Sequence, residues 1–143
     1  MAGISASMQN YLKAIYELSP DGEGARICDI AAKLGVTKPS TCTAMRHLQR
    51  TRMIYRDADR LVFLTSDGKK QAVWALDKVE ILHRFLIEVL DIRYETADAD
   101  ARVLEHSMSR ETLCAICRFA KLKCSGNCRT QTKATINTKP HSD

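Results

Sequence analysis

The chain has 143 residues, of which 45% are hydrophobic and 27% are charged. This apolar content excludes collagen-like and fully disordered chains, and it suits one ordinary domain or two small domains that share a core. The sequence has no run of about 18 apolar residues, and its first residues lack the apolar segment of a signal peptide. We therefore expect a cytoplasmic protein that has no membrane partner.

The net charge of +5 is unevenly distributed along the chain. Residues 26–56 hold seven Lys and Arg side chains against one acid, which gives +6. Residues 57–113 hold eight basic and twelve acidic side chains, which gives −4. A concentrated basic stretch predicts a surface that faces a polyanion, although an ordinary solvated face would carry the same charge.

The first half of the chain has the pattern of a winged helix-turn-helix. Apolar spacing, Ser and Thr N-caps and a Gly C-cap predict three helices, at 5–18, 26–34 and 37–50. Gly35 lies in the tight connection between the second and third helices, and Thr37 is the N-cap of the third. Two short strands with a four-residue turn between them are predicted at 53–56 and 61–64. Together these elements predict a winged DNA-binding fold.

The second half of the chain predicts helices only. Thr65 caps a connector helix of about 25 residues, whose apolar positions recur at spacings of three and four. Shorter helices follow at 96–107 and 110–123, and residues 129–143 have the composition of a disordered tail. We predict a mainly α chain with a winged helix-turn-helix domain, a connector helix with a helical dimerisation domain, and a Cys-containing tail, at 1–70, 71–123 and 124–143.

The third helix is the element that a winged helix places in the major groove. Its polar positions are predicted to contact base edges through four side chains, Ser40, Thr41, Thr43 and Arg46. Phosphate contacts are assigned to Lys38, Arg50 and the residue at the tip of the wing, Arg60. The alternative is a winged helix that is used for contact with another protein.

Five segments, in order along the chain, resemble the diphtheria toxin repressor family of iron- and manganese-dependent transcriptional repressors. They are MQNYLKAIYEL (8–18), DIAAKLGV (29–36), LTSDGK (64–69), RFLIEVL (84–90) and LEHSMS (104–109). The resemblance is to the short members, which lack the C-terminal SH3-like domain. It implies a homodimer that binds double-stranded DNA at a palindromic operator when Fe²⁺ or Mn²⁺ is bound.

The resemblance also assigns metal positions, and most of them do not carry the family's ligands. Glu105 and His106 match the family's Glu-His pair. Asn10 stands where the family has Asp or Met, Lys13 where manganese-specific members have Glu, and Arg102 where members have Cys or Glu. On the connector helix, Val79 replaces a ligand His. Two further candidates remain at positions that are often acidic or His in the family, His83 and Asp98.

Two cations at ligand positions predict that this site has degenerated. Two unit charges about 4 Å apart repel by about 4 kcal/mol at an effective dielectric constant of 20, and Lys13 and Arg102 would both face the ion. Our hypothesis is that Lys13 and Arg102 pair with Glu105 and substitute for the metal. The alternative is a reduced metal site that consists of four side chains, His83, Asp98, Glu105 and His106.

Four of the six cysteines lie within fifteen residues, in a CxxC-x6-CxxxC pattern: Cys114, Cys117, Cys124 and Cys128. Four thiolates at these spacings can hold Zn²⁺ or an iron–sulfur cluster, and nearby basic residues would also favour oxidation to a disulfide. Reduced thiols without a ligand fit the pattern as well. The cluster therefore predicts a metal or redox input without choosing between them.

We expect a non-enzymatic transcriptional regulator, a repressor by the resemblance, because the sequence has none of the usual catalytic motifs. The chain would have no small-molecule substrate. The dimer is predicted to bury apolar side chains that include Val89, Leu90, Leu104, Met108 and Leu113. The alternatives are a Zn- or Fe–S-binding protein that uses its winged helix for protein contact, and a thiol-redox enzyme that uses Cys114 and Cys117.

Overall fold

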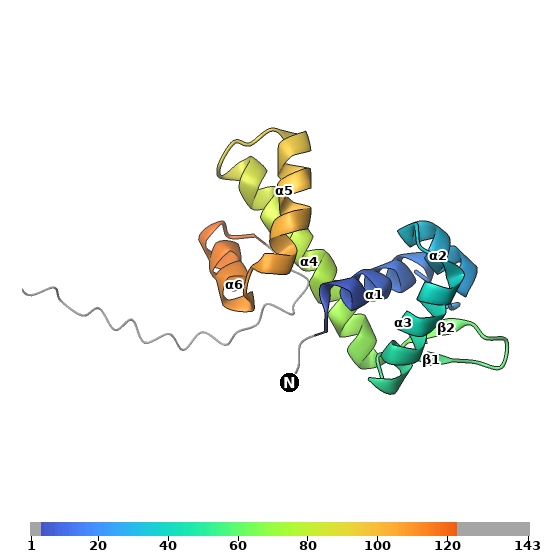
Figure 1. Ribbon diagram of the computed structural model, residues 1–143. Helices are drawn as coiled ribbons and strands as arrows, with labels where there is room; N and C mark the ends of the chain where they lie inside the picture. Colours follow the sequence, from blue (N-terminus) through green and yellow to red (C-terminus); the bar gives the residue numbers. More distant parts are fainter. Residues whose placement is uncertain (1–3, 123–143) are drawn as a thin grey trace, which may run out of the picture.

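The computed structural model describes residues 4–122, which form two lobes joined by one long helix (Figure 1). The winged-helix lobe contains α1 (Ala6–Leu18), α2 (Ile27–Leu34), α3 (Lys38–Arg50), β1 (Ile54–Arg56) and β2 (Val62–Leu64). The long helix is α4 (Ser66–Glu88), and the helical lobe adds α5 (Tyr94–Ser107) and α6 (Arg110–Phe119). The mainly helical fold with a winged helix-turn-helix and a connector helix is confirmed.

The helices begin where the sequence offers a side-chain cap. The hydroxyl oxygens of four residues each accept a hydrogen bond from a backbone N–H in the first turn: Ser5, Thr37, Thr65 and Ser109. Gly35 ends α2 in the left-handed conformation, with φ of 64°, which costs a residue without Cβ little. The tight turn that orients α3 against α2 therefore follows from the sequence.

The core of the winged-helix lobe lies between α1, α3 and the hairpin. Its fully buried side chains include Leu12, Ile15, Ile30, Met45 and Leu48. The hairpin pairs Ile54 with Leu64 and Arg56 with Val62. Ala25 adds one more bridge, because its N–H and carbonyl both bond to Val62. The sequence did not predict this bridge, since a single residue has no periodicity to detect.

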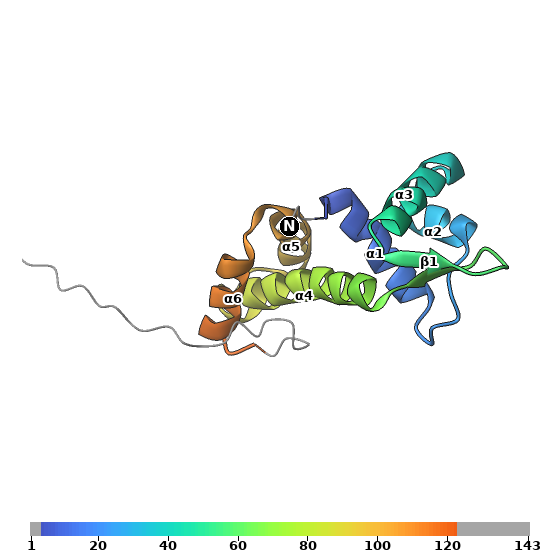
Figure 2. The ribbon, with the colours of Figure 1, turned by 90° about the horizontal axis from the view of Figure 1, so that it is seen from below.

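The helix α4 passes from one lobe to the other without a break and packs against α1, α5 and α6 (Figure 2). Near its start, a Cβ on Gly68 would overlap the carbonyl oxygen of Met53, so only glycine allows this close approach to the winged helix. Two small cores form in the helical lobe, around Ile81 and around Leu82, Ala101 and Leu113. Nowhere in residues 4–122 is a helix both long and apolar enough to cross a membrane.

Candidate nucleic-acid interface and the Glu105 cluster

The helix α3 presents polar and basic side chains to solvent on one face. Its exposed polar and basic residues are Lys38, Ser40, Thr43, Arg46, His47, Gln49 and Arg50. The opposite face is buried in the core through Thr41, Ala44, Met45 and Leu48. The expectation that Thr41 lies on the exposed face is therefore wrong. Its side chain is fully buried, and its hydroxyl donates a 3.0 Å hydrogen bond to the carbonyl of Thr37.

Short contacts position Arg46 on the exposed face. The hydroxyl of Thr43 donates to the carbonyl of Pro39 at 3.1 Å, and the Arg46 guanidinium donates from Nη2 to the Thr43 oxygen at 3.2 Å. The guanidinium therefore lies toward the N-terminal end of α3, on the side of the helix that faces solvent. A guanidinium in this position still has free N–H groups, which can donate to two acceptors at once.

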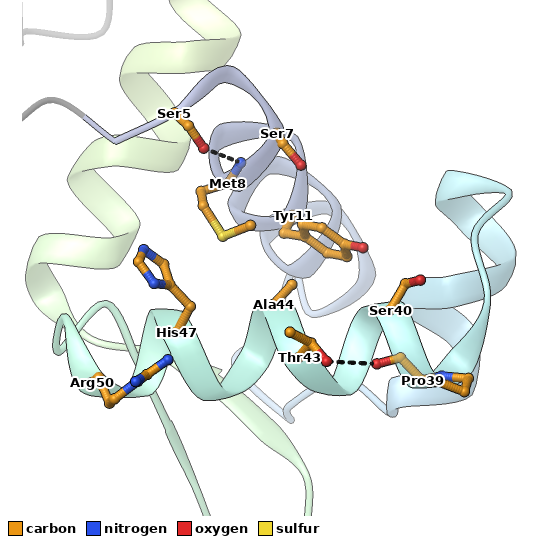
Figure 3. Close-up of a pocket in the computed structure, with 10 residues that line it drawn as sticks. All are labelled: Ser5, Ser7, Met8, Tyr11, Pro39, Ser40, Thr43, Ala44, His47 and Arg50. Carbon is orange, nitrogen blue, oxygen red and sulfur yellow. Dashed lines mark hydrogen bonds between the residues drawn. The ribbon is translucent and has the colours of Figure 1, made fainter.

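A groove of about 720 Å³ separates the exposed face of α3 from the start of α1 (Figure 3). The α1 wall is formed by Ser5, Ser7, Met8 and Tyr11, and the α3 wall includes Thr43, His47 and Arg50. Besides the apolar Met8, Pro39 and Ala44, the groove is lined by hydroxyl, imidazole and guanidinium groups, all of which can donate hydrogen bonds. The N-terminus of α1 therefore borders the surface that α3 offers.

The wing projects beside α3 as a short two-stranded ribbon. Tyr55 and Phe63 stack on its face with ring centroids 5.2 Å apart. The turn is closed by Asp57, whose carboxylate accepts the N–H of Leu61 at 2.8 Å. Arg60 in this turn has φ of 63° and is exposed, so its charge is available at the tip of the wing; its phosphate contact stays a prediction.

Between the lobes, Glu105 is the centre of a buried polar cluster. Its side chain is 2% exposed, and its Oε1 lies 2.8 Å from the ammonium of Lys13. Its Oε2 lies 3.4 Å from the ammonium of Lys78, as an ion pair without hydrogen-bond geometry. We call Gln9, Lys13, Lys78, Glu105 and His106 the Glu105 cluster.

Lys78 is the charged member of the cluster that the sequence did not reveal, and its partner Gln9 was missed with it. Its ammonium donates to the amide oxygen of Gln9 at 2.8 Å and to the carbonyl of Glu105 at 3.3 Å. The side chain is 7% exposed. A signal was present, because Lys78 lies three residues after the buried Ala75 and four before the buried Leu82, on one face of α4.

Arg102 does not pair with Glu105, and this part of the sequence hypothesis is wrong. Its guanidinium forms two hydrogen bonds with Asp98, one turn earlier on α5, at 3.1 and 3.2 Å. This pairing with Asp98 raises the pKa of Arg102. The side chain is 67% exposed, because solvent solvates a guanidinium better than the protein interior does.

The remaining predicted metal positions are not brought together. His83 packs edge-on against Tyr94, with ring centroids 4.9 Å apart, and Asp98 is held by Arg102. Asn10 lines a separate groove together with Lys13 and Arg102. His106 lies 3.4 Å from Glu105, whose two oxygens already face ammonium groups. Across residues 4–122, no three His, Cys, Asp or Glu side chains are placed to hold a metal ion.

The residues present therefore do not fit a divalent ion at the family's site. A divalent ion needs several oxygen or nitrogen ligands with net negative charge. Glu105 is the one buried carboxylate of the cluster, and two ammonium groups neutralise it. The prediction of a degenerate site rested on Lys13 and Arg102, whereas the two cations that face Glu105 are Lys13 and Lys78.

Of the four clustered cysteines, the two that the structure describes are in α6. Cys114 and Cys117 are both buried, and the thiol of Cys117 donates to the carbonyl of Leu122 at 3.1 Å. Cys124 and Cys128 lie outside the described residues. The Zn²⁺, iron–sulfur and disulfide hypotheses for this pattern stay predictions.

The apolar residues predicted for a dimer interface separate into two groups. Val89, Leu90 and Leu104 are 41%, 50% and 36% exposed in the single chain, so a second chain could cover them. Leu113 is fully buried within the chain, and Met108 packs against the cluster around it. Leu113 is therefore a core residue and not an interface residue. Other exposed apolar side chains in the helical lobe are Tyr94, Val103 and Phe119.

Two family domains match this chain. Residues 3–55 match the iron-dependent repressor N-terminal DNA-binding domain, and residues 65–122 match the iron-dependent repressor metal-binding and dimerisation domain. These ranges correspond to the winged-helix lobe and to α4 with the helical lobe.

Similar proteins are transcriptional regulators. The chain is 34% identical over 114 residues to the transcriptional regulator MntR of Escherichia coli O157:H7, which covers 80% of this chain and 73% of that protein. It is 28% identical over 101 residues to the iron-dependent repressor IdeR of Mycobacterium tuberculosis, covering 71% of this chain and 44% of that protein. The structure of the manganese regulator SloR superposes with a TM-score of 0.69 at 27% identity, over 82% of this chain and 55% of that one.

Proposed function

Because the chain belongs to the iron-dependent repressor family, we propose that it binds a palindromic operator as a homodimer and represses transcription in the cytoplasm. The observation that supports this function best is the exposed face of α3, where hydroxyl and guanidinium groups lie beside a hairpin with a cationic tip. The transcriptional regulators to which the chain is similar are not enzymes. The alternative of a winged helix that serves only protein contact is not favoured.

We assign base-edge contacts to three residues that α3 exposes, Ser40, Thr43 and Arg46. Arg46 is suited to donate two parallel hydrogen bonds to a guanine, while the short hydroxyls contact either acceptor or donor groups. We assign phosphate contacts to Lys38, Arg50 and Arg60, which lie at the two ends of α3 and at the wing tip. None of these three forms an ion pair within residues 4–122, so their charges remain available for DNA.

We propose that the partner subunit covers the exposed apolar residues of the helical lobe, Val89, Leu90 and Leu104 among them. The match to a dimerisation domain over residues 65–122 supports this assignment, because these residues lie within that range. A dimer related by a two-fold axis presents two α3 helices, and an operator with two-fold symmetry offers each of them one half-site.

The test is selection of operator duplexes from a random-sequence pool with the purified protein, followed by affinity measurements at several salt concentrations. We expect enrichment of a palindromic sequence, two chains per duplex, and an affinity that falls steeply with salt because phosphate contacts release counterions. Failure to enrich any sequence, together with salt-independent binding to a protein, would contradict the proposal.

We also propose that the CxxC-x6-CxxxC pattern provides a metal or redox input to the regulator. The proposal is supported by the sequence spacing, which places Cys114 and Cys117 one turn apart in α6. Elemental analysis and an absorption spectrum of protein purified without oxygen test it. Zinc without colour, or iron with a broad visible band, identifies the ligand. Four free thiols with no metal, both in this preparation and after exposure to air, would contradict the proposal.

A further inference from the structure

We propose that the ammonium groups of Lys13 and Lys78 take the place of the divalent ion at Glu105, so that operator binding by this chain does not require Mn²⁺ or Fe²⁺. The inference rests on the proposed function and specifies its regulation. The family is one of metal-dependent repressors, and a built-in cation would make this member respond differently from the relatives that its sequence resembles.

The first support is the location of the charges. Both oxygens of Glu105 face a lysine ammonium, at 2.8 and 3.4 Å, and all three side chains are more than four-fifths buried. A carboxylate buried in this way needs a neighbouring cation, because the protein interior solvates a lone negative charge poorly. The two lysines meet that need, and an added divalent ion would be repelled by both.

The second support is that the Glu105 cluster connects elements from both lobes. Lys13 and Gln9 lie on α1 of the winged-helix lobe, Lys78 lies on α4, and Glu105 lies on α5 of the helical lobe. These contacts connect α1 to α4 and α5. Since α1 also lines the groove beside α3, the cluster fixes where the recognition surface lies relative to the dimerisation surface.

The third support is that the two lysines contact Glu105, whereas Arg102 does not. Arg102 occupies a ligand position by resemblance, yet its guanidinium is exposed and bonded to Asp98 on its own helix. It therefore contributes no tie between the lobes. Arg102 provides a matched control, because removing its charge alters the same part of the molecule without altering the cluster.

The first arm of the test uses the unmodified chain and the operator selected above. Affinity is measured by fluorescence anisotropy in chelator and again with millimolar Mn²⁺ or Fe²⁺, and metal binding is measured separately by titration calorimetry with Mn²⁺. We expect affinities that agree within about twofold and no Mn²⁺ binding at micromolar concentrations. An increase of about tenfold or more with either metal overturns the inference. Absence of sequence-specific binding in every condition overturns the proposed function instead.

The second arm uses Lys13→Gln, Lys78→Gln and the control Arg102→Gln, each checked for helix content and for its dimeric state. We expect the two lysine variants to lose about tenfold or more in operator affinity in chelator, while Arg102→Gln stays within about twofold. A folded, dimeric Lys13→Gln that binds as tightly as the unmodified chain overturns the positioning role. If the lysine variants fail to fold, the metal response of the unmodified chain still decides the inference.

The third arm converts the ammonium into a ligand. In Lys13→Glu two carboxylates face each other near His106, and a divalent ion between them relieves their repulsion. We expect this variant to bind Mn²⁺ in calorimetry and to regain about tenfold or more in operator affinity when Mn²⁺ is added. A variant that binds no Mn²⁺ contradicts the placement of the Lys13 ammonium at the cation's position.

Discussion

The α3 face and the Glu105 cluster both depend on cationic side chains, but they place them in opposite surroundings. On α3 and the wing, Lys38, Arg50 and Arg60 are exposed and form no ion pair within the described part of the chain. In the cluster, the ammonium groups of Lys13 and Lys78 are buried against one carboxylate. Residue type alone therefore does not determine what a cation does in this protein.

The difference lies in what each charge is paired with. Exposed cations meet a partner only when another molecule supplies it, and salt screens that interaction over a distance of about 8–10 Å. Buried cations have their partner within the chain, and water and salt reach them poorly. We therefore expect the first set to control DNA affinity and its salt dependence, and the second set to control stability and geometry.

Glu105→Gln should lower the free energy of unfolding more than substitutions of exposed residues on α3 and α4 do. The substitution leaves two buried ammonium groups without their counter-charge, and loss of one partner from a buried pair costs about 3–5 kcal/mol. Equilibrium unfolding in urea measures the change in the free energy of unfolding. Glu111→Gln, an exposed position on α6, is the control and should change it little. Equal unfolding midpoints for the two variants would show that the cluster does not stabilise the fold.

Arg46→Ala tests the exposed face of α3. The variant would lose the proposed bidentate contact with a base, so affinity for the selected operator should fall by about 1–3 kcal/mol while the free energy of unfolding stays unchanged. Competition between the operator and a duplex altered at one base pair measures the specificity. Arg84→Ala removes the same charge from a half-exposed position on α4 and should leave specificity intact. An equal loss of specificity in both variants would show that Arg46 contributes only a non-specific positive charge.

Arg50→Gln is expected to weaken binding to all duplexes by a similar, smaller factor. Loss of one phosphate contact lowers the magnitude of the slope of log affinity against log salt by about 0.9. Binding measured at four or more salt concentrations, on the operator and on an unrelated duplex, gives both slopes. An unchanged slope would mean that Arg50 does not contact a phosphate.

The smallest effect concerns an ion pair on the surface of α4. The Arg84 guanidinium donates to Glu88 at 2.8 Å, and this bond lowers the pKa of the Glu88 carboxyl. A lowered pKa stabilises the fold at pH values above the titration of the unfolded carboxyl, and the contribution is lost as pH falls through the folded-state pKa. Thermal unfolding of Glu88→Gln should show a slight decrease in Tm at neutral pH that disappears in acid. A decrease that persists in acid would point to lost packing instead.

The helices and the wing could be predicted from the sequence because their signals are local. Apolar periodicity and N-caps are each contained in a few residues, and the structure confirms the predicted caps at Thr37 and Thr65. Helix ends were less certain, since α6 ends at Phe119 and not near residue 123. The resemblance to the repressor family supplied the connectivity that periodicity alone does not give.

The errors at the sites came from contacts between distant residues. By resemblance, Lys13 and Arg102 both stand at metal-ligand positions. Lys13 is 92 residues from Glu105 along the chain and Arg102 only three, yet the packing of the helices brings Lys13 and not Arg102 to the carboxylate. Lys78 was missed for the same reason, because a lysine within an apolar pattern looks like a solvated position until its partners are known. Thr41 was misplaced because helical spacing does not show which flank of α3 meets the core.

The helix α1 borders both the Glu105 cluster and the groove beside α3. Its middle contacts the buried carboxylate through Lys13, while its first turn forms the wall of the groove opposite His47 and Arg50 (Figure 3). Because one helix carries both contacts, we expect a change in the Glu105 cluster to move the α1 wall of the groove, and so to affect the surface that α3 exposes without any substitution on that surface.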